Sequence, residues 1–550
     1  MHLLVKFILI GKFFLCLITG SAVAQESLSS IKHILVIGVD GMSPDGIRQA
    51  KTPNIDWLVA NGASTFRARG VLPSSSSPNW ASMIMGAGPV QHGITSNAWE
   101  KDDFVLPAAA ASDNGYFPSI FTLVHDQKPK ATAAAIYHWD GFGRLFDSTL
   151  LDLSISPETE DATAEMAADY LTKKQPLFCF VHFDHVDGAG HSKGHGTPDY
   201  YTAVSKADSL IGVLLGALRQ AKMLEHTLVI LSADHGGIGF GHGGETPEEV
   251  EIPFILYGKT IKPGYQIKGM VNTCDNAVTA AFALGLEIPN AWTGRPVKEA
   301  FIGYDVPKIT YPVKPLIRKP RIHPEKIGFE QAGGLFIDSL PILKIDNPNE
   351  SGTIHYTLNG DTPEQSDPVY NQPFSLKKTT VVKAAIFDDH TKISKDAVAY
   401  FRILDPAPDR GVQYETYLVP GIDKLPEFTQ LKPASKGQTH EIHLADVKLP
   451  QDEQVAAIFT SYINIKTAGE YRFYLASDDG SKLYINDELV VDNDGDHGVI
   501  ERSGKINLPV GKQRLKVQWF NGGGGSGLYL FYKGPDVPKQ LVPADVLYVK

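Results

Sequence analysis

The sequence predicts a multidomain protein in which an α/β domain is followed by two all-β sandwich domains. Up to about residue 305, short apolar runs that end in Asp alternate with helical patterns, which is typical of parallel strands joined by helices. From about residue 335, short alternating segments are separated by turn clusters such as Asn359-Gly360-Asp361, which is typical of β-sandwiches. A chain of 550 residues is also too long for one core and should divide into about three domains.

The N-terminal segment has the pattern of a secretory signal. Basic residues and an apolar core precede Ala-Val-Ala and then Gln25. We therefore expect residues 1–24 to be a cleaved signal peptide and the protein to be exported, either periplasmic or extracellular. No later stretch of 18 or more apolar residues follows, so we expect no transmembrane segment after signal cleavage.

Charge and cysteine content exclude some classes of function. The formal net charge is −11 with 21% charged residues, which argues against a nucleic-acid-binding surface. Cys179 and Cys274 remain after the signal segment, and Cys179 lies in the apolar run LFCFVHF. A buried thiol is therefore favoured over a disulfide.

Six acidic and histidine residues occur close to the ends of apolar runs in the first domain. They are Asp40 in HILVIGVDGM, Asp187 and His191 in FCFVHFDHVDGAGH, Asp234 and His235 in LVILSADHGG, and His242 in FGHGG. The carboxyl ends of parallel strands deliver side chains to one crevice. Three oxygen and three nitrogen ligands suit two divalent ions, and carboxylate with imidazole favours zinc over manganese or iron. Each residue alone is more often a turn or cap residue, so the prediction rests on their joint order.

A serine run supplies the candidate nucleophile. In GVLPSSSSPNWASMIMGAG, Ser76 and Ser77 precede Pro78, and proline is tolerated in the first turn of a helix. Both serines are therefore expected at a helix N-terminus, where free N–H groups favour an anion such as phosphate. The alternative is a flexible surface loop.

These stretches resemble the alkaline phosphatase superfamily, closest to its type I phosphodiesterase/nucleotide pyrophosphatase branch. The matching motifs are VDGM, TPNIDWLVANGA, LPSSSSPNW, GAGPVQHGITSN, DGAGH, ADHGG and GHGG, in the family's order. The resemblance implies an alkaline phosphatase-like catalytic domain over residues 25–305, with Ser76 as nucleophile and Asn79 as a contact to a phosphoryl oxygen. It implies one metal ion held by Asp40, Ser76, Asp234 and His235, and a second held by Asp187, His191 and His242.

One departure concerns specificity. The branch usually has Thr-Lys-Thr-Phe before Pro-Asn, whereas this chain has four serines, Ser74 to Ser77. The missing aromatic residue removes a stacking surface for a nucleobase, so nucleotide specificity stays open while the metal chemistry is unaffected. His138, Asp140 and His195 stay open between residues that face the substrate and ordinary loop residues.

The implied activity is that of an exported two-metal phosphoester hydrolase, a phosphodiesterase acting on a small-molecule or glycan-linked phosphoester. A phosphomonoesterase is the alternative, but the sequence shows no clear extra Arg or Lys for a dianionic phosphate. A sulfatase is disfavoured because Trp80 stands where the sulfatase signature needs arginine. A carbohydrate-binding or adhesive protein with an inert hydrolase domain is the alternative from a different class.

The C-terminal part resembles two accessory β-sandwich domains. Residues 306–334 are expected to form a proline-rich, basic connector. With the segments IHYTLNGDTPEQSDPVY and TTVVKAAIF, residues 335–403 resemble the C-terminal domain of chitobiases and β-hexosaminidases. With INIKTAGEYRFYLASDDGSKLYINDELVVDNDG and INLPVGKQRLKVQWFNGGGGSGLYLFY, residues 404–550 resemble the protective-antigen-type domain. In adhesin members of the last family, consecutive aspartates help to bind calcium and sugar, and Asp478 and Asp479 match them. A calcium ion and a carbohydrate partner are thus implied, with a purely structural domain as the alternative.

Overall fold

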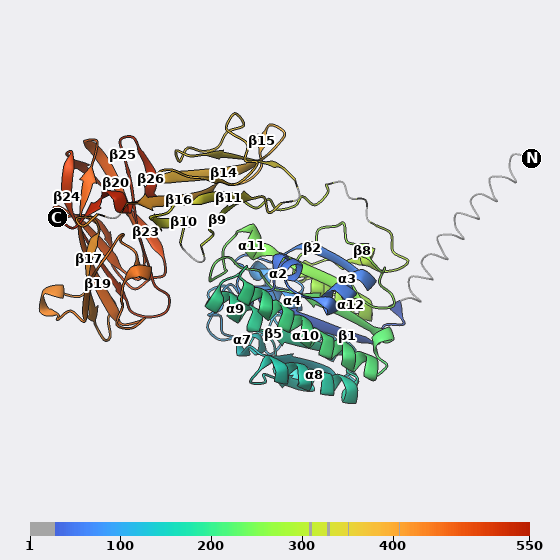
Figure 1. The fold of residues 1–550 in the computed structure, drawn as a ribbon. Helices are drawn as coiled ribbons and strands as arrows, with labels where there is room; N and C mark the ends of the chain where they lie inside the picture. Colours follow the sequence, from blue (N-terminus) through green and yellow to red (C-terminus); the bar gives the residue numbers. More distant parts are fainter. Residues whose placement is uncertain (1–27, 307, 309–310, 327–329, 350, 406) are drawn as a thin grey trace, which may run out of the picture. The chain divides into compact units, whose positions relative to one another are not determined.

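The computed structural model describes residues 28–306, 308, 311–326, 330–349, 351–405 and 407–550. The chain divides into two compact units, residues 1–316 and 317–550 (Figure 1). The first unit is α/β and the second is all-β, which confirms the predicted multidomain fold class. The predicted signal peptide, residues 1–24, lies outside the described residues.

An eight-stranded sheet forms the centre of the first unit, in the order β4-β3-β5-β1-β6-β7-β2-β8. Its strands are β1 (His33–Val39), β2 (Ala63–Arg69), β3 (Ala133–Tyr137), β4 (Leu153–Ile155), β5 (Phe178–Phe183), β6 (Thr227–Ser232), β7 (Glu251–Tyr257) and β8 (Tyr265–Gln266). The five strands from β4 to β6 are parallel, and β7 is antiparallel to both of its neighbours. Strands β5 and β6 are buried along their whole length, as expected of parallel strands covered on both faces.

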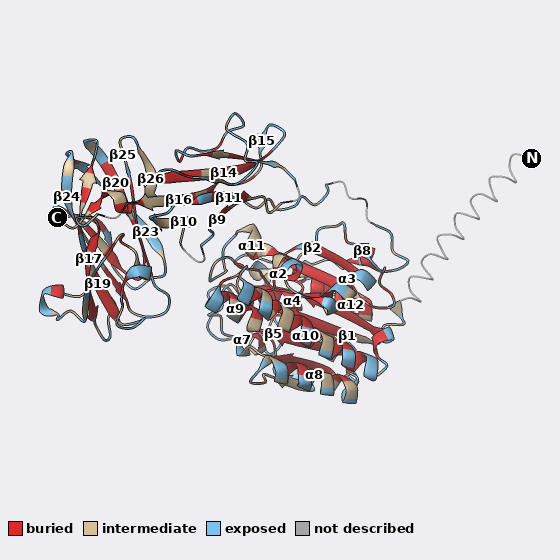
Figure 2. Ribbon diagram, viewed as in Figure 1, coloured by how far each residue is buried: buried red, intermediate tan, exposed pale blue. Residues whose placement is uncertain are grey.

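Two helical layers pack on this sheet. The helices are α2 (Pro44–Gln49), α3 (Pro53–Asn61), α4 (Ser76–Met85), α5 (Pro89–His92), α6 (Ile120–Gln127), α7 (Asp140–Gly143), α8 (Glu160–Lys174), α9 (His185–Lys193), α10 (Pro198–Gln220), α11 (Pro247–Val250) and α12 (Asp275–Leu284). Helix α10 packs against α2, α3, α8 and α9, and α4 packs against α6 and α12. Figure 2 shows the sheet buried and the outward sides of α8 and α10 exposed.

Local sequence explains where these helices begin. The Thr197 side chain accepts a hydrogen bond from the backbone N–H of Tyr200, and Pro198 fills the first position of α10. Thr159 caps α8 in the same way, and α8 has acidic residues in its first turn and lysines in its last. Helix α10 is the one helix in the described part of the chain that is long and apolar enough to cross a membrane, and half of its most apolar window is buried inside the unit.

Helix α4 lies unusually close to the sheet. All ten of its residues are buried, and Trp80 packs over β1 at Gly38. A Cβ atom added at Gly38 would lie 2.5 Å from the Trp80 ring, so only glycine permits this approach. The N-terminus of α4 is thereby fixed beside the end of β1.

The second unit contains four β-sheets. Its strands are β9 (Arg321–His323), β10 (Ala332–Ile337), β11 (Ile342–Asp346), β12 (Thr353–Thr357), β13 (Phe374–Ser375), β14 (Thr380–Asp388), β15 (Thr391–Lys392), β16 (Ala397–Leu404), β17 (Val412–Leu418), β18 (Ser435–Thr439), β19 (Val455–Ile465), β20 (Gly469–Asp478), β21 (Ser481–Ile485), β22 (Glu488–Asn493), β23 (Ile500–Leu508), β24 (Gly511–Asn521), β25 (Gly527–Gly534), β26 (Val537–Leu541) and β27 (Leu547–Tyr548). Strands β9 to β16 form a five-stranded and a three-stranded sheet, and β17 to β27 form a seven-stranded and a four-stranded sheet.

Each pair of sheets has its own apolar core, and the two pairs also contact each other. Val381 and Tyr400 from the first pair pack against Phe531 of the second. A largely buried ion pair joins Arg402 to Glu441 with a separation of 2.6 Å. The second unit is therefore one packed body built from two β-sandwiches.

Candidate active site

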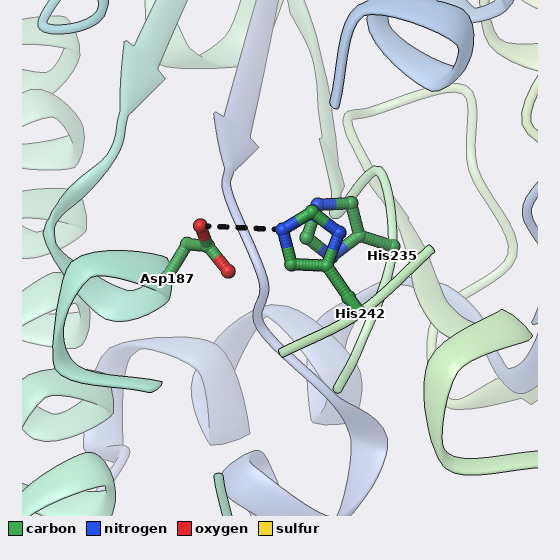
Figure 3. A group of neighbouring side chains, drawn as sticks. All are labelled: Asp187, His235 and His242. Carbon is green, nitrogen blue, oxygen red and sulfur yellow. Dashed lines mark ion pairs between the residues drawn. The ribbon is translucent and has the colours of Figure 1, made fainter. Parts of the chain in front are cut away.

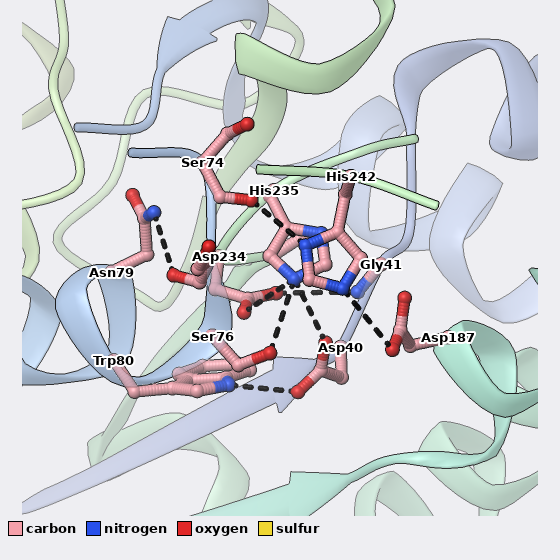
Figure 4. A network of polar contacts seen from close by, with 12 residues as sticks. Asp40, Gly41, Ser74, Ser76, Asn79, Trp80, Asp187, Asp234, His235 and His242 are labelled. Carbon is pink, nitrogen blue, oxygen red and sulfur yellow. Dashed lines mark hydrogen bonds and ion pairs between the residues drawn. The ribbon is translucent and has the colours of Figure 1, made fainter. Parts of the chain in front are cut away.

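The sheet order brings the candidate metal ligands to one edge. Asp40 follows β1, Asp187 lies in the first turn of α9 just after β5, and Asp234 follows β6. Because β5, β1 and β6 are neighbouring parallel strands, their carboxyl ends place these three carboxylates together (Figure 4). His242 joins them from the loop before α11.

The first group surrounds the imidazole of His235. Its Nε2 atom lies 3.3 Å from Asp40 Oδ1, 3.2 Å from Asp234 Oδ2 and 3.3 Å from Ser76 Oγ. Asp40, Asp234 and His235 are at most 1% exposed, and Ser76 is 5% exposed. Asp40 Oδ1 and Asp234 Oδ2 accept no hydrogen bond from any described residue. Two buried carboxylate oxygens thus face one ring nitrogen without a proton donor between them.

The second group contains Asp187, His191 and His242. His191 Nε2 lies 3.1 Å from Asp187 Oδ2 and 3.1 Å from His242 Nε2. The remaining separation, His242 Nε2 to Asp187 Oδ2, is 3.7 Å. The rings of His235 and His242 stack with centroids 3.7 Å apart, so the two groups adjoin (Figure 3).

Backbone carbonyls fix which nitrogen each imidazole offers. The Nδ1 atoms of His235, His242 and His191 lie 2.7, 3.0 and 2.8 Å from the carbonyl oxygens of Gly236, Ser74 and Phe240. A carbonyl can only accept, so each Nδ1 carries a proton, and Nε2 is the atom that each ring turns toward the carboxylates. Imidazole nitrogens and carboxylate oxygens that face one another in this way fit divalent cations, which would bind between them.

Electrostatics lead to the same conclusion. Burial, together with the negative charges of Asp234 and Asp187, raises the pKa of Asp40 well above its usual range. Burial and Asp187 likewise raise the pKa of Asp234. Burial lowers the pKa of His235 to about 3, and the hydrogen bond to Asp187 raises that of His191 to about 8. Burial alone would raise the pKa of Asp187, but the hydrogen bond from His191 and the charges of His235 and His242 lower it.

Two further side chains hold Asp40 in place. Its Oδ2 atom accepts from Trp80 Nε1 at 2.9 Å and lies 3.3 Å from His182 Nε2. Burial lowers the pKa of His182 to about 3, so this ring is neutral. Asp40 Oδ2 is therefore occupied by neutral donors, and Oδ1 faces the cluster. Asp40, His182 and Asp184 also form a third group whose ligand atoms lie within 4.8 Å of one another.

Helix α4 begins at Ser76, as the proline in its first turn predicts. Ser75 is the N-cap residue with extended backbone, and Ser76 points toward His235. The backbone N–H of Ser77 donates to Asn97 Oδ1 at 2.8 Å. Ser76 is thus the serine whose hydroxyl reaches the candidate metal ligands.

Asn79 has a different environment from the one implied by the resemblance. It is fully buried, its Oδ1 accepts from the backbone N–H of Val71, and its Nδ2 lies within 3.3 Å of the carbonyl oxygens of Val71, Pro73 and Ser75. The Asn79 amide would have to break these hydrogen bonds to contact a phosphoryl oxygen. The geometry favours a structural role, in which Asn79 shapes the segment before Ser76.

Several residues of the site were not predicted from the sequence. Trp80 was considered only because it stands where a sulfatase would have arginine. No role was assigned to His182, although His182 lies in the same apolar run as Asp187. Asn97 and Arg144 come from segments without metal-ligand patterns. Arg144 donates to Ser77 Oγ at 3.3 Å and to the carbonyl oxygen of Asn97.

The three open residues separate into two kinds. His195 is largely buried beside the second group, with its Nε2 3.8 Å from Asp187 Oδ1. His138 Nε2 lies 3.3 Å from the carbonyl oxygen of Glu158, and Asp140 begins α7. Only His195 contacts a candidate ligand directly.

The two aspartates of the second unit differ in their partners. Asp479 is 3% exposed and accepts backbone N–H groups of His497 at 3.0 Å and of Gly522 at 2.8 Å. Burial and the charge of Asp479 raise the pKa of Asp478 to about 6. This carboxyl pair thus carries unfavourable charge that a cation would relieve.

Sequence-family profiles match three parts of the chain. Residues 34–240 match the type I phosphodiesterase/nucleotide pyrophosphatase family, residues 332–398 the chitobiase/β-hexosaminidase C-terminal domain, and residues 433–545 the PA14 domain. These are the three families that the sequence motifs resemble, so the predicted resemblances are confirmed.

Individual relatives are distant. The chain is 23% identical over 218 residues to ectonucleotide pyrophosphatase/phosphodiesterase family member 3 of Rattus norvegicus, covering 37% of this chain and 24% of the relative. It is 23% identical over 240 residues to family member 5 of Homo sapiens, covering 41% of this chain and 50% of the relative. The chain thus spans a quarter to a half of the length of these curated relatives.

Among solved structures, murine ectonucleotide pyrophosphatase/phosphodiesterase 5 aligns with a TM-score of 0.43 and 14% identity, covering 49% of this chain and 100% of that chain. The family assignment rests on the profiles and on the sequence relatives. Residues 34–240 therefore form a domain of the type I phosphodiesterase/nucleotide pyrophosphatase family, and a chitobiase/β-hexosaminidase C-terminal domain and a PA14 domain follow it.

Proposed function

We propose that the protein is an exported, metal-dependent phosphoester hydrolase that acts as a phosphodiesterase with Ser76 as its nucleophile. One observation carries this proposal. Three imidazoles, each fixed through Nδ1 by a backbone carbonyl, turn Nε2 toward buried carboxylates beside a serine at a helix N-terminus. Export is inferred from the signal-like pattern of residues 1–24.

Two divalent ions, most suitably zinc, complete the site in this proposal. Asp40, Ser76, Asp234 and His235 would hold one, and Asp187, His191 and His242 would hold the other. When bound, such ions supply Lewis-acid polarisation and neutralise negative charge on the phosphoryl oxygens and the reacting oxygens.

The residues of the chain perform the rest of the chemistry. The N-terminus of α4 directs its dipole toward the phosphoryl group. Ser76 Oγ gives up its proton and forms a bond to phosphorus, while the bond from phosphorus to the leaving alcohol oxygen breaks and that oxygen takes up a proton from solvent. A water molecule then attacks phosphorus and releases the phosphomonoester product, and Ser76 Oγ regains a proton. Trp80 and His182 keep Asp40 oriented throughout, because they occupy its Oδ2 atom.

The diester preference is supported by the family and by its relatives' names, which include pyrophosphatases, phosphodiesterases and a bis(5′-adenosyl)-triphosphatase. The serines at positions 74–77 leave no aromatic residue there for a nucleobase, so we do not restrict the substrate to nucleotides. A small-molecule or glycan-linked phosphoester is the proposed substrate class.

The two β-sandwiches are proposed to attach the enzyme to carbohydrate. This role is supported by the chitobiase-type and PA14 families. A calcium ion at Asp478 and Asp479 would relieve the raised pKa of Asp478 and is the proposed anchor for sugar.

A hydrolysis comparison tests the proposal. Metal-loaded protein should hydrolyse bis-p-nitrophenyl phosphate, with slower or no turnover of p-nitrophenyl sulfate, and removal of metals should abolish the activity. A protein that binds metal and polysaccharide but hydrolyses neither phosphate esters nor the sulfate would instead be an adhesive protein with an inert hydrolase domain.

A further inference from the structure

Arg144 is a half-buried cation that contacts Ser77, the residue after the candidate nucleophile, and no sequence motif marks it. It directly follows α7, and its Nη2 donates to Ser77 Oγ at 3.3 Å and to the carbonyl oxygen of Asn97. Its Nη1 donates to Glu100 Oε1 at 2.7 Å. The Nε–H group is buried and has no hydrogen-bond partner among the residues that the structure describes.

The surroundings of Arg144 fix it at the edge of the site. Helix α7 follows β3, and Phe142 of α7 stacks on His182, the ring that lies against Asp40. The guanidinium carbon lies 5.9 Å from the centre of the Trp139 ring. Its partner Ser77 is the residue after Ser76 in the first turn of α4. These contacts place Arg144 beside Ser77, next to the candidate nucleophile, with the Trp139 ring on one side of its guanidinium.

An unpaired buried N–H group costs free energy, so the Arg144 Nε–H group is a donor that an oxygen of a bound substrate would satisfy. The guanidinium is always charged and its planar fork matches two oxygens of a phosphoryl group. We infer that Arg144 binds a phosphoryl oxygen of the substrate and gives the site affinity for dianionic phosphate groups, so that it accepts phosphomonoesters as well as diesters. This inference rests on the proposed phosphoester chemistry at Ser76.

The charge of the substrate's phosphoryl group decides how strongly the Arg144 guanidinium attracts it. A monoester carries two negative charges at pH 8 and a diester only one, so an added cation favours the monoester more. The pair with Glu100 does not prevent this, because the Glu100 side chain is 56% exposed and an exposed ion pair contributes little. A phosphoryl group can replace Glu100 as the partner while Glu100 turns to solvent.

The test uses the full-length, metal-loaded protein and the variants Arg144→Ala, Arg144→Gln and Arg144→Lys. Arg219→Ala is the matched control, because this substitution removes the same charge elsewhere in the unit. Arg219 lies in the last turn of α10, over the Trp57 ring. Binding of inorganic phosphate is measured by calorimetry, and kcat/KM is measured for p-nitrophenyl phosphate and bis-p-nitrophenyl phosphate. Thermal unfolding checks that each variant is folded.

Loss of a hydrogen bond to a charged group predicts that Arg144→Ala and Arg144→Gln weaken phosphate binding about ten- to a hundredfold. Monoester turnover should fall by a larger factor than diester turnover, Arg144→Lys should recover part of the loss, and Arg219→Ala should match the unmodified protein. If a folded Arg144→Ala protein binds phosphate within about twofold of the unmodified protein, or if the unmodified protein binds none, the inference is wrong. Arginine-dependent phosphate binding without hydrolysis of either ester would uphold the phosphate contact at Arg144 but refute the proposed hydrolase function and, with it, the use of monoesters as substrates.

Discussion

The local sequence places the Ser76 hydroxyl beside the candidate metal ligands. Pro78 in the first turn of α4 and extended backbone at Ser75 put the Ser76 hydroxyl 3.3 Å from His235 Nε2. The Ser74 hydroxyl donates to the carbonyl oxygen of Gly244, and the Ser77 hydroxyl accepts from Arg144. Ser76 is therefore the candidate nucleophile among the four consecutive serines.

Ser76→Ala should remove turnover while leaving the fold and most of the metal content intact, because the carboxylate and imidazole ligands remain. A loss of about a thousandfold or more in kcat is expected for a nucleophile, measured with bis-p-nitrophenyl phosphate. Ser75→Ala and Ser77→Ala serve as controls. Full activity of Ser76→Ala together with loss in Ser75→Ala or Ser77→Ala would place the nucleophile one residue away.

Trp80→Phe tests how Asp40 is oriented. The change keeps an aromatic ring between α4 and β1 but removes the N–H that donates to Asp40 Oδ2 at 2.9 Å. A hydrogen bond that orients a metal ligand is typically worth about ten- to a hundredfold in metal affinity, so zinc binding should weaken by a factor in that range. Competition with a zinc chelator measures it. Unchanged zinc affinity would mean that His182 alone orients the carboxylate.

Residue patterns predicted the candidate metal ligands but not the residues that surround them. Asp40, Asp187 and Asp234 could be predicted because each lies at or close to the end of an apolar run, and parallel strands make such ends converge. The environment of Asn79 and the position of Arg144 could not be predicted, because they depend on how loops close over α4. No periodicity in the sequence encodes that closure.

At the scale of elements, the packing of α4 on β1 couples fold to site. Gly38 allows the Trp80 ring to lie against β1, and the same helix carries Ser76 at its start. The hydrophobic patterns predicted a helix and a strand here, but the close contact depends on the missing side chain at Gly38 and on the shape of the Trp80 ring. The sequence alone does not show that these two residues meet.

Gly38→Ala should therefore destabilise the protein. The new methyl group would lie 2.5 Å from the Trp80 ring, and overpacking of a core typically costs about 1–3 kcal/mol. Denaturant unfolding measures the change. The control is Gly216→Ala in α10, where a Cβ meets nothing within 4 Å and a gain of about 0.5–1 kcal/mol is expected. Equal stability of both variants would show that the helix shifts at no cost.

At the scale of the whole molecule, charge at the site should make stability depend on pH. In the metal-free protein Asp40 and Asp234 have raised pKa values, so at these two groups the folded state binds more protons than the unfolded chain, and their contribution to stability is lost as pH rises. His182 and His235, whose pKa is lowered to about 3, act in the opposite sense below about pH 6.5. His191, with its pKa raised to about 8, contributes stability below about pH 6.5 that is lost as pH rises through 8. Asp187, whose pKa is lowered, loses its contribution only in more acidic solution.

Bound metal ions should reverse this trend, because they compete with protons for the same atoms. The difference in melting temperature between metal-loaded and chelator-treated protein should widen from about pH 5 to about pH 8.5. Thermal scans across this range measure it. A difference that narrows as pH rises would mean that the carboxylates of the cluster do not hold the ions.

The division into two units predicts a division of labour. Ser76 and all candidate ligands of the two proposed zinc ions lie in residues 40–242, inside the first unit, which has its own apolar core. A protein lacking residues 317–550 should hydrolyse a small soluble diester within about threefold of the full chain and lose binding to polysaccharide. A folded truncation without turnover would show that the β-sandwiches contribute to catalysis.

The central claim is that two ions occupy two defined groups of ligands. Elemental analysis of the purified, metal-loaded protein and of two variants tests it most directly. We predict two divalent ions per chain in the unmodified protein, falling toward one in Asp234→Ala and toward one in His242→Ala, since each variant removes a ligand from a different group. A count near zero in the unmodified protein after metal loading, or an unchanged count in both variants, would contradict the account.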